Sequence, residues 1–158
     1  MTAAALLGVF ESGEALVGVL GLGYVGLPLA DAMHGGGMRV LGFDIDPAKV
    51  AALSDGRNYL KHLGTDMTAA LAASHRFEAT SDFSRLDEPD AIIVCVPTPL
   101  GPQRQPDLRF VIESGEAIGR RLRDNHPIVL QSTPYPGTTR DELLPAILKA
   151  AEQRGTFQ

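Results

Sequence analysis

Three glycines spaced as Gly-x-Gly-x-x-Gly constrain this chain more than any other feature. They are Gly21, Gly23 and Gly26, and they follow an apolar run over residues 17–20 that predicts a buried strand. A helical pattern over residues 24–33 comes next. The spacing alone is weak, because glycines recur in loops by chance. Its position between a buried strand and a helix makes it typical of the first turn of a parallel α/β sheet.

Each glycine has a physical reason to stand where it does. Gly21 allows a tight turn, Gly23 lets the backbone come within contact of a pyrophosphate, and Gly26 lets the helix pack against the strand. Backbone N–H groups and the positive end of the helix dipole can hold phosphates without a lysine. The loop therefore predicts a pyrophosphate site.

An acidic residue stands where the next strand is expected to end. Asp44 lies 18 residues beyond Gly26, at a position where a carboxylate accepts hydrogen bonds from ribose hydroxyls. A carboxylate there repels the 2′-phosphate of NADP, so NAD is the predicted cofactor. Lys49, one helical turn further on, is expected to reach the ribose or phosphate edge. The alternative for Asp44 and for Lys49 is a solvated side chain with no ligand.

Strands and helices alternate along the whole chain. Helices are expected over residues 3–15, 24–33, 46–55, 66–74, 107–122 and 138–148, and strands over residues 17–20, 38–43, 76–80, 91–96 and 127–131. This alternation predicts an α/β fold, a doubly wound Rossmann-type parallel sheet with helices on both faces. We expect a helical extension over residues 1–16 and a nucleotide-binding domain over residues 17–158.

Local signals predict three details of the later helices. Asp107 is expected to be the N-cap of the fifth helix. In the last helix, Pro145 is expected to produce a kink. The core face of that helix is expected to consist of four large side chains, Leu143, Leu144, Ile147 and Leu148.

Composition narrows the classes of partner. With 44% hydrophobic and 21% charged residues, the 158-residue chain suits one folded domain rather than a disordered segment. Its net charge of -5 argues against nucleic acid and anionic membranes as partners. Its N-terminus makes a poor signal peptide and no apolar run is long enough to span a bilayer, so a cytoplasmic location is expected. The four histidines lack metal-ligand spacing, and a single cysteine rules out an internal disulfide.

Further segments together resemble one family. They are Gly-Tyr-Val-Gly-Leu-Pro at residues 23–28, Phe-Asp-Ile-Asp at 43–46, Cys-Val-Pro-Thr-Pro at 95–99, and Gln-Ser-Thr at 131–133, followed by Tyr-Pro-Gly-Thr-Thr at 135–139. The combination, which covers about residues 15–150, resembles the N-terminal NAD-binding domain of the UDP-glucose/GDP-mannose dehydrogenase family. Residues 135–139 and 105–107 resemble the UDP-N-acetylglucosamine or UDP-N-acetylgalactosamine 6-dehydrogenases in particular.

The resemblance implies a reaction and a set of residues. Such enzymes oxidise the C6 alcohol of a UDP-sugar to a carboxylate with two NAD+, through an enzyme-bound thiohemiacetal. The implied cofactor-binding residues are Gly21, Gly23, Tyr24, Val25, Gly26, Asp44, Lys49, Thr98, Ser132 and Thr133. Thr133 also resembles the family threonine that helps to position a catalytic water. The alternatives are a turn residue for Thr98 and strand-end caps for Ser132 and Thr133.

The resemblance also implies what these residues lack. The nucleophilic cysteine and the sugar-nucleotide domain of the family are expected outside this chain, so the 158 residues are predicted to turn over no sugar nucleotide. Cys95 lies inside an apolar strand, where a thiol is a small buried hydrophobe with a raised pKa. A UDP-sugar substrate and a homo-oligomeric state are implied for the complete enzyme.

Two other interpretations stay open. One is a stand-alone NAD-binding or regulatory module, which differs from the first interpretation only in what the gene encodes after residue 158. The other is the cofactor domain of a 3-hydroxyacyl or 6-phosphogluconate type of dehydrogenase, which the Pro97-Thr98-Pro99 segment and the Ser132-Thr133 pair disfavour.

Overall fold

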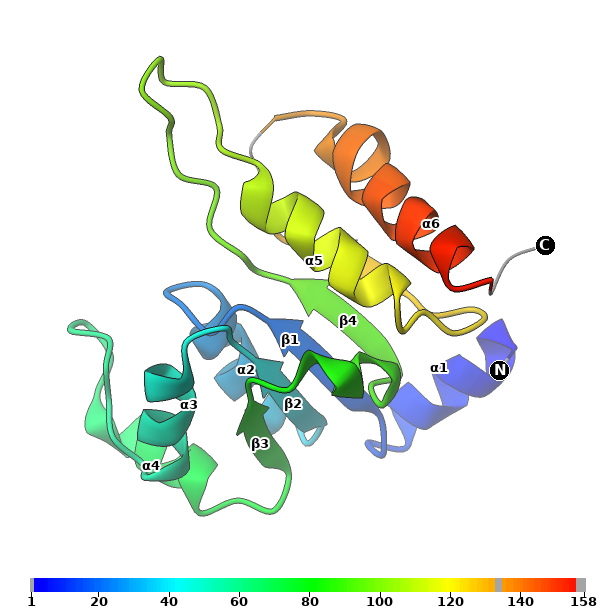
Figure 1. Ribbon diagram of the computed structural model, residues 1–158. Coiled ribbons are helices and arrows are strands. Elements are labelled where there is room, and N and C mark those ends of the chain that lie inside the picture. The colour runs from blue at the N-terminus through cyan, green and yellow to red at the C-terminus, as the bar shows by residue number, and fades with distance from the viewer. Residues whose placement is uncertain (1, 133–134, 156–158) are drawn as a thin grey trace.

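A five-stranded parallel sheet organises the chain, with the strand order β3-β2-β1-β4-β5 (Figure 1). The computed structural model describes residues 2–132 and 135–155. The strands are β1 (Leu16–Leu20), β2 (Arg39–Phe43), β3 (Phe77–Thr80), β4 (Ala91–Val94) and β5 (Ile128–Leu130). β1 pairs with β2 on one side and with β4 on the other. The direction of winding therefore reverses at β1, which is where open α/β sheets bind ligands.

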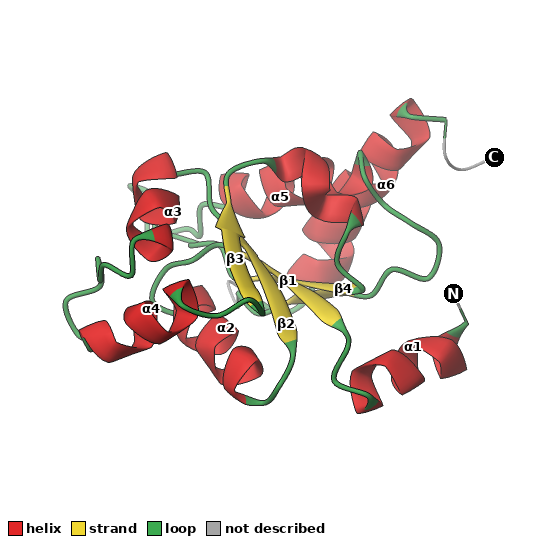
Figure 2. Cartoon of the chain, turned by 90° about the horizontal axis from the view of Figure 1, so that it is seen from below, coloured by secondary structure: helices red, strands yellow, loops and turns green. Residues whose placement is uncertain are grey.

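Helices cover both faces of the sheet (Figure 2). They are α1 (Ala3–Glu11), α2 (Gly26–Gly35), α3 (Pro47–Ser54), α4 (Thr65–Ala72), α5 (Arg109–Gly119) and α6 (Leu144–Gln153), with a short 3-10 helix η1 (Phe83–Asp87) and one π-helical turn η2 (Thr139–Leu143). The expected doubly wound Rossmann-type sheet is confirmed.

Each strand contributes to two cores because successive side chains point to opposite faces. Val19 packs in a cluster with Leu27 of α2 and Leu53 of α3. Its neighbour Leu20 belongs to a second cluster with Val111 of α5. The continuous apolar strands of the sequence are thus explained by burial on both faces.

Several element boundaries differ from the sequence-based expectation; the first helix, for example, ends at Glu11 rather than at residue 15. Two of the differences concern residues near the glycine loop and α5. Helix α2 begins at Gly26 rather than Tyr24, so Tyr24 remains part of the glycine loop. The N-cap of α5 is Leu108, not Asp107. The Asp107 carboxylate instead forms a salt bridge with the guanidinium of Arg109 at 2.6 Å and accepts its backbone N–H at 3.1 Å. Asp107 thus accepts the first N–H of α5 although it stands one residue before the N-cap position.

The predicted core face of the last helix is half wrong. Leu144 and Leu148 are 45% and 42% exposed, whereas the buried residues of α6 are Ala146, Ile147, Ala150 and Ala151. The reason is a very close approach of α6 to α5: a Cβ on Gly119 would lie 2.2 Å from the carbonyl oxygen of Ile147. Small residues fill such a contact and the large leucines are displaced to the outside. Pro145 lies in the first turn of α6, directly after the π-helical turn η2, so the helix is irregular where a kink was expected.

The N-terminal helix α1 stands apart from these layers. Thr2 caps it by accepting the backbone N–H of Ala5 at 3.2 Å, and none of its residues is buried. Within residues 2–132 and 135–155, no helix combines the length and the apolar character needed to cross a membrane.

Candidate functional site

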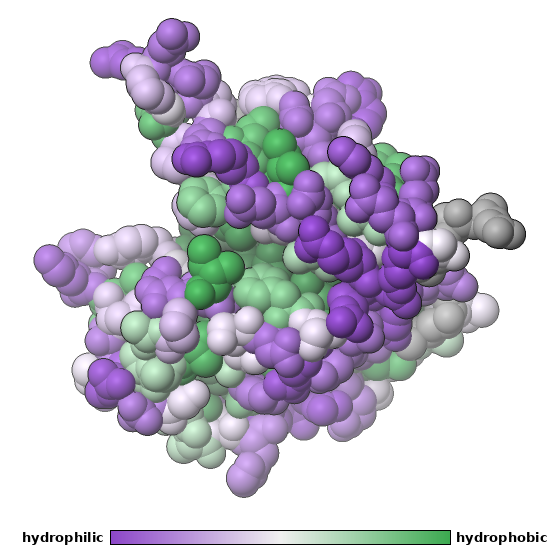
Figure 3. Space-filling model, viewed as in Figure 1, coloured by the Kyte–Doolittle hydropathy of each residue, from purple (hydrophilic) through white to green (hydrophobic). Residues whose placement is uncertain are grey.

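A cavity of about 900 Å³ opens on the face of the molecule that carries α5 and η1. Figure 3 shows it as an apolar hollow bordered by hydrophilic side chains. Eight of the predicted cofactor-binding residues line it: Gly21, Gly23, Tyr24, Val25, Asp44, Lys49, Thr98 and Ser132. Gly26 is buried and does not line the cavity, and Thr133 falls outside the described residues. The structure thus brings together residues that are more than 100 positions apart in the sequence.

The three glycines of the loop occupy three different environments. Gly21 has φ +94°, and a Cβ on it would lie 2.8 Å from the carbonyl oxygen of Cys95. A Cβ on Gly26 would lie 1.7 Å from the carbonyl oxygen of Gly21, so the start of α2 packs directly on the turn. Among the described residues other than its two chain neighbours, no atom lies within 4 Å of the position that a Cβ on Gly23 would take. The open space at Gly23 fits a ligand that approaches the backbone there.

The loop presents unpaired backbone donors to the cavity. In the described part of the chain, the N–H groups of Gly23, Tyr24 and Val25 donate to no protein acceptor. Val25 is the N-cap of α2 and offers no side-chain cap, so the positive end of the helix dipole is open at this point. Adjacent free N–H groups at a helix N-terminus form an anion site, and they fit the pyrophosphate of a dinucleotide.

Asp44 is not a solvated strand-end residue, because it is only 6% exposed. Its Oδ2 accepts the N–H of Leu22 at 3.0 Å, and its Oδ1 accepts the N–H of Asp46 at 2.9 Å. Lys49 Nζ lies 3.6 Å from Asp44 Oδ2. The carboxylate thus connects the end of β2 to the glycine loop and places a negative charge on the cavity wall. Its contact with a ribose stays a prediction.

Tyr59 holds the glycine loop through a hydrogen bond, a role that sequence reasoning missed. Its hydroxyl donates to the carbonyl oxygen of Leu22 at 2.6 Å, and Lys49 Nζ lies 5.9 Å from its ring centroid. Burial, reinforced by the nearby carboxylates of Asp44 and Asp46, raises the pKa of Tyr59, so the phenol remains a donor. No local pattern in the sequence indicates this contact, because 37 residues separate its two partners.

The ends of β4 and β5 form the opposite wall. The Ser132 hydroxyl donates to the carbonyl oxygen of Val96, which ties the two strand ends together and leaves its lone pairs free to accept. Thr98 lies two residues after Val96, between Pro97 and Pro99, and also lines the cavity.

Cys95 lies at the base of the cavity and is 8% exposed. Burial raises the pKa of its thiol to about 11, as expected from its apolar strand. At pH 7 only about one thiol in ten thousand is then ionised. Cys95 is therefore a poor nucleophile.

A second set of residues extends the cavity along α5, away from the glycine loop. Its apolar floor contains Phe43 and Phe83, whose ring centroids are 5.9 Å apart at an interplanar angle of 46°. Its wall is one face of α5 and consists of Phe110, Glu113, Ser114, Ala117 and Arg120. Sequence reasoning assigned only the core face of this helix. The spacing of the missed residues, at steps of three or four, is the helical signal that could have revealed a second face.

The fold and the cavity define a class. A parallel sheet that reverses its winding at β1, a glycine loop with free N–H groups and an acidic residue at the end of β2 make this a dinucleotide-binding domain. Within the described residues there is no group of three or more His, Cys, Asp or Glu side chains that could hold a metal ion.

Comparison with known proteins identifies the family. The family model for the NAD binding domain of the UDP-glucose/GDP-mannose dehydrogenase family matches residues 15–158. The chain belongs to this family, as its motifs indicated, and its cofactor is NAD.

Individual relatives agree with this membership. The UDP-N-acetyl-D-glucosamine 6-dehydrogenase of Pseudomonas aeruginosa is 35% identical over 133 residues, which are 84% of this chain and 31% of that protein. The structure of a UDP-glucose dehydrogenase from Pyrobaculum islandicum matches with a TM-score of 0.82 and 33% identity, over 92% of this chain and 34% of the other. A GDP-mannose dehydrogenase from Pseudomonas aeruginosa matches with a TM-score of 0.81 and 26% identity, over 86% and 32%. The chain thus spans about a third of the length of these relatives.

Proposed function

We propose that this chain is the cofactor domain of an enzyme that oxidises the C6 hydroxyl of a UDP-sugar to the uronic acid with two NAD+. A UDP-N-acetylhexosamine is the favoured substrate. The observation that carries the proposal is the continuous cavity wall formed by the glycine loop, Asp44 and the ends of β4 and β5. Support for the sugar comes from relatives named as UDP-N-acetyl-D-glucosamine 6-dehydrogenases in Pseudomonas aeruginosa and Salmonella typhi.

Each part of the wall has a separate task in this proposal. The N–H groups of Gly23, Tyr24 and Val25 bind the pyrophosphate, and Asp44 accepts the ribose hydroxyls with Lys49 beside it. When bound, NAD+ supplies the acceptor for the hydride from C6.

The opposite wall is assigned to the nicotinamide half. Thr98 and Ser132 present hydroxyl groups to it, and Thr133 is proposed to position a water. In this arrangement the chain's own residues bind and orient the cofactor, while the sugar is held by other parts of the enzyme.

The nucleophile of the proposed two-step oxidation is not Cys95. Its thiol is buried and protonated at neutral pH, as its raised pKa of about 11 requires. The 158 residues alone are therefore expected to produce no NADH from a UDP-sugar. A homo-oligomeric enzyme and a cytoplasmic location belong to the same proposal, on the strength of family membership and the sequence composition.

An activity assay tests the proposal. The complete enzyme encoded by the gene is supplied with NAD+ and UDP-N-acetylglucosamine, UDP-N-acetylgalactosamine or UDP-glucose, and NADH absorbance is followed. We expect two NADH per sugar oxidised, with an N-acetylhexosamine preferred, and none from the 158-residue chain. NAD binding without oxidation of any of these sugars would favour a regulatory NAD-binding module instead.

A further inference from the structure

The segment that joins β4 to α5 projects from the body of the protein (Figure 1). Residues 99–107 of this segment are named the β4–α5 hairpin below. Its two sides pair through an antiparallel bridge between Leu100 and Pro106. Inside that bridge, the N–H of Gly101 donates to the carbonyl oxygen of Gln105 at 2.7 Å. The projection is therefore a hydrogen-bonded hairpin rather than an irregular loop.

The β4–α5 hairpin is exposed along its whole length. Every residue from 97 to 110 is at least partly exposed, and Leu100 is 68% exposed. An isolated two-stranded hairpin is only marginally stable in water. The prolines at positions 99, 102 and 106 restrict the backbone of the segment before it folds, which favours this shape. A preformed projection that carries an exposed leucine is typical of a binding surface.

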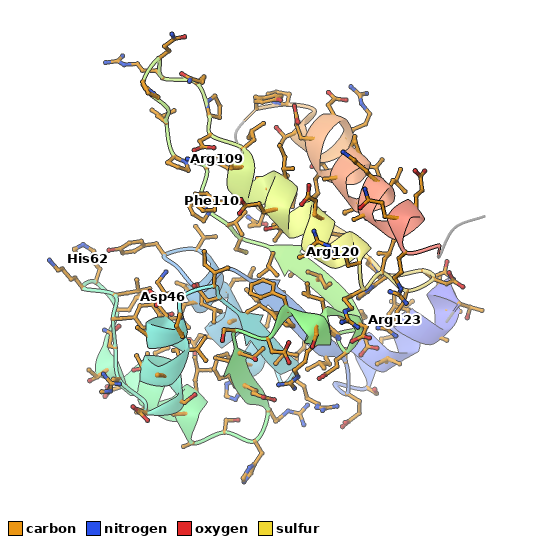
Figure 4. All side chains as sticks on the ribbon, in the orientation of Figure 1. Asp46, His62, Arg109, Phe110, Arg120 and Arg123 are labelled. Atoms are coloured by element: carbon orange, nitrogen blue, oxygen red, sulfur yellow. The ribbon has the colours of Figure 1, made fainter. Side chains whose placement is uncertain are left out.

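A bound dinucleotide leaves the β4–α5 hairpin uncovered. Among the described residues, the lining of the cavity includes Thr98 and Phe110 but no residue between them. Figure 4 places Phe110 and its neighbour Arg109 where the hairpin joins α5. In Figure 3 the hairpin stands at the rim of the apolar hollow. The hairpin thus begins one residue after Thr98, at the edge of the wall assigned to the nicotinamide.

The length of the relatives indicates what covers the hairpin. The chain spans about a third of these proteins, and in the proposed function the sugar is held by other parts of the enzyme. Hydride transfer requires the sugar carbon to lie within about 3 to 3.5 Å of the nicotinamide. The sugar-binding part must therefore close over the wall that ends at Thr98. The β4–α5 hairpin projects from that same edge.

We propose that the β4–α5 hairpin docks on the sugar-binding part of the complete enzyme, encoded after residue 158, and holds it over the nicotinamide wall. The proposal rests on the proposed function. The surface that receives the hairpin has an apolar pocket for Leu100. It also has a carboxylate for Arg104, because Arg104 at the hairpin tip forms no salt bridge within the described residues.

Limited digestion with trypsin tests whether the hairpin is covered. The bond after Arg104 lies at the exposed tip, and exposed loop tips are preferred sites of cleavage. With NAD+ present in both samples, we expect cleavage there to be at least about tenfold slower in the complete enzyme than in the 158-residue chain. Leu100→Asn should bring the rate in the complete enzyme back to within about threefold of that chain, because an amide is costly to bury in an apolar pocket.

Steady-state kinetics provides a second readout. Leu100→Asn in the complete enzyme should raise the KM for the UDP-sugar by about tenfold. The same change in the 158-residue chain should alter NAD+ affinity by less than about 1.5-fold, because Leu100 does not line the cavity, and normal NAD+ binding also shows that the variant folds. Arg104→Glu should raise the KM by about two- to fivefold, as expected for a charge at the rim of an interface.

Leu7→Asn is the matched control. Leu7 is 60% exposed on α1, outside the residues that the family model matches, so it should change neither the cleavage after Arg104 nor the KM. Equal cleavage of the two proteins overturns the proposal, as does a Leu100→Asn enzyme that stays protected. Protection that is lost when the enzyme is diluted would mean that a second copy covers the hairpin, and this also overturns it. A complete enzyme that protects the tip but oxidises no UDP-sugar would refute the proposed function and leave the contact standing.

Discussion

The two ends of the cavity are built by different means. At the phosphate end a single segment, residues 21–26, presents backbone N–H groups, and its shape is fixed by one hydrogen bond that it donates to Asp44 and one that it accepts from Tyr59. At the end that extends along α5, side chains from β2, η1 and α5 meet across a largely apolar space. The backbone packing at Gly21 and Gly26 leaves no room for an added Cβ, and at Gly23 an added side chain competes with the ligand, whereas substitutions on an apolar surface change ligand affinity gradually. Substitutions should therefore have sharp effects at the first end and graded effects at the second.

The largest effect is expected at Gly26, on the stability of the fold. Gly26→Ala places a Cβ 1.7 Å from the carbonyl oxygen of Gly21, and neither backbone can move without disturbing the turn. We expect a loss of about 3 kcal/mol or more in the free energy of unfolding, measured in urea. Gly23→Ala in the same loop is the control and should cost less than about 1 kcal/mol, because its Cβ would meet no atom within 4 Å from the described residues beyond its chain neighbours. Equal losses would show that the two glycines do not differ as described.

A larger side chain at Gly23 should lower the affinity for NAD+ rather than the stability of the fold. Gly23→Val fills the open space into which the pyrophosphate must come, and we expect NAD+ affinity to fall by more than about a hundredfold. Circular dichroism should remain that of the wild type, since in the described part of the chain no residue beyond the two neighbours of Gly23 comes within 4 Å of the added Cβ. A variant that binds NAD+ normally would place the phosphates somewhere other than this loop.

Asp44 tests the choice between the two nicotinamide dinucleotides. Asp44→Ala removes a charged acceptor from the ribose and should weaken NAD+ binding by about 1.5 to 3 kcal/mol. Because Asp44 also holds the N–H groups of Leu22 and Asp46, part of that loss can come from the loop itself. The ratio of NAD+ to NADP+ affinities is independent of such damage and should fall toward one. If the ratio is unchanged, a residue other than Asp44 discriminates between NAD+ and NADP+.

The smallest effect is expected at Tyr59. Tyr59→Phe keeps the ring and removes only the hydrogen bond to Leu22, so NAD+ affinity and stability should each decrease by about 0.5 to 1.5 kcal/mol. Tyr135→Phe provides the matched control, because its hydroxyl bonds Glu142 on the exposed surface. That change should cost less than about 0.5 kcal/mol in an unfolding experiment. Identical costs for the two tyrosines would remove the supporting role assigned to Tyr59.

The same contrast explains what could be predicted from the sequence. The glycine loop and Asp44 follow from spacing along one segment, and the strands follow from apolar runs buried on both faces. Tyr59 could not be found this way, because its partner is defined only by the fold. Leu144 and Leu148 were misplaced for a similar reason: the close approach of α5 and α6 through Gly119 decides which face of α6 is buried, and that approach is tertiary.

Titration of the unaltered 158-residue chain with NAD+ and with NADP+ tests the central claim most directly. The claim is that this cavity holds NAD through the glycine loop and Asp44. It predicts saturable binding of one NAD+ per chain and an NADP+ affinity at least about tenfold lower, because the buried carboxylate of Asp44 opposes a 2′-phosphate. Equal affinities for the two cofactors, or no binding of either, would contradict it.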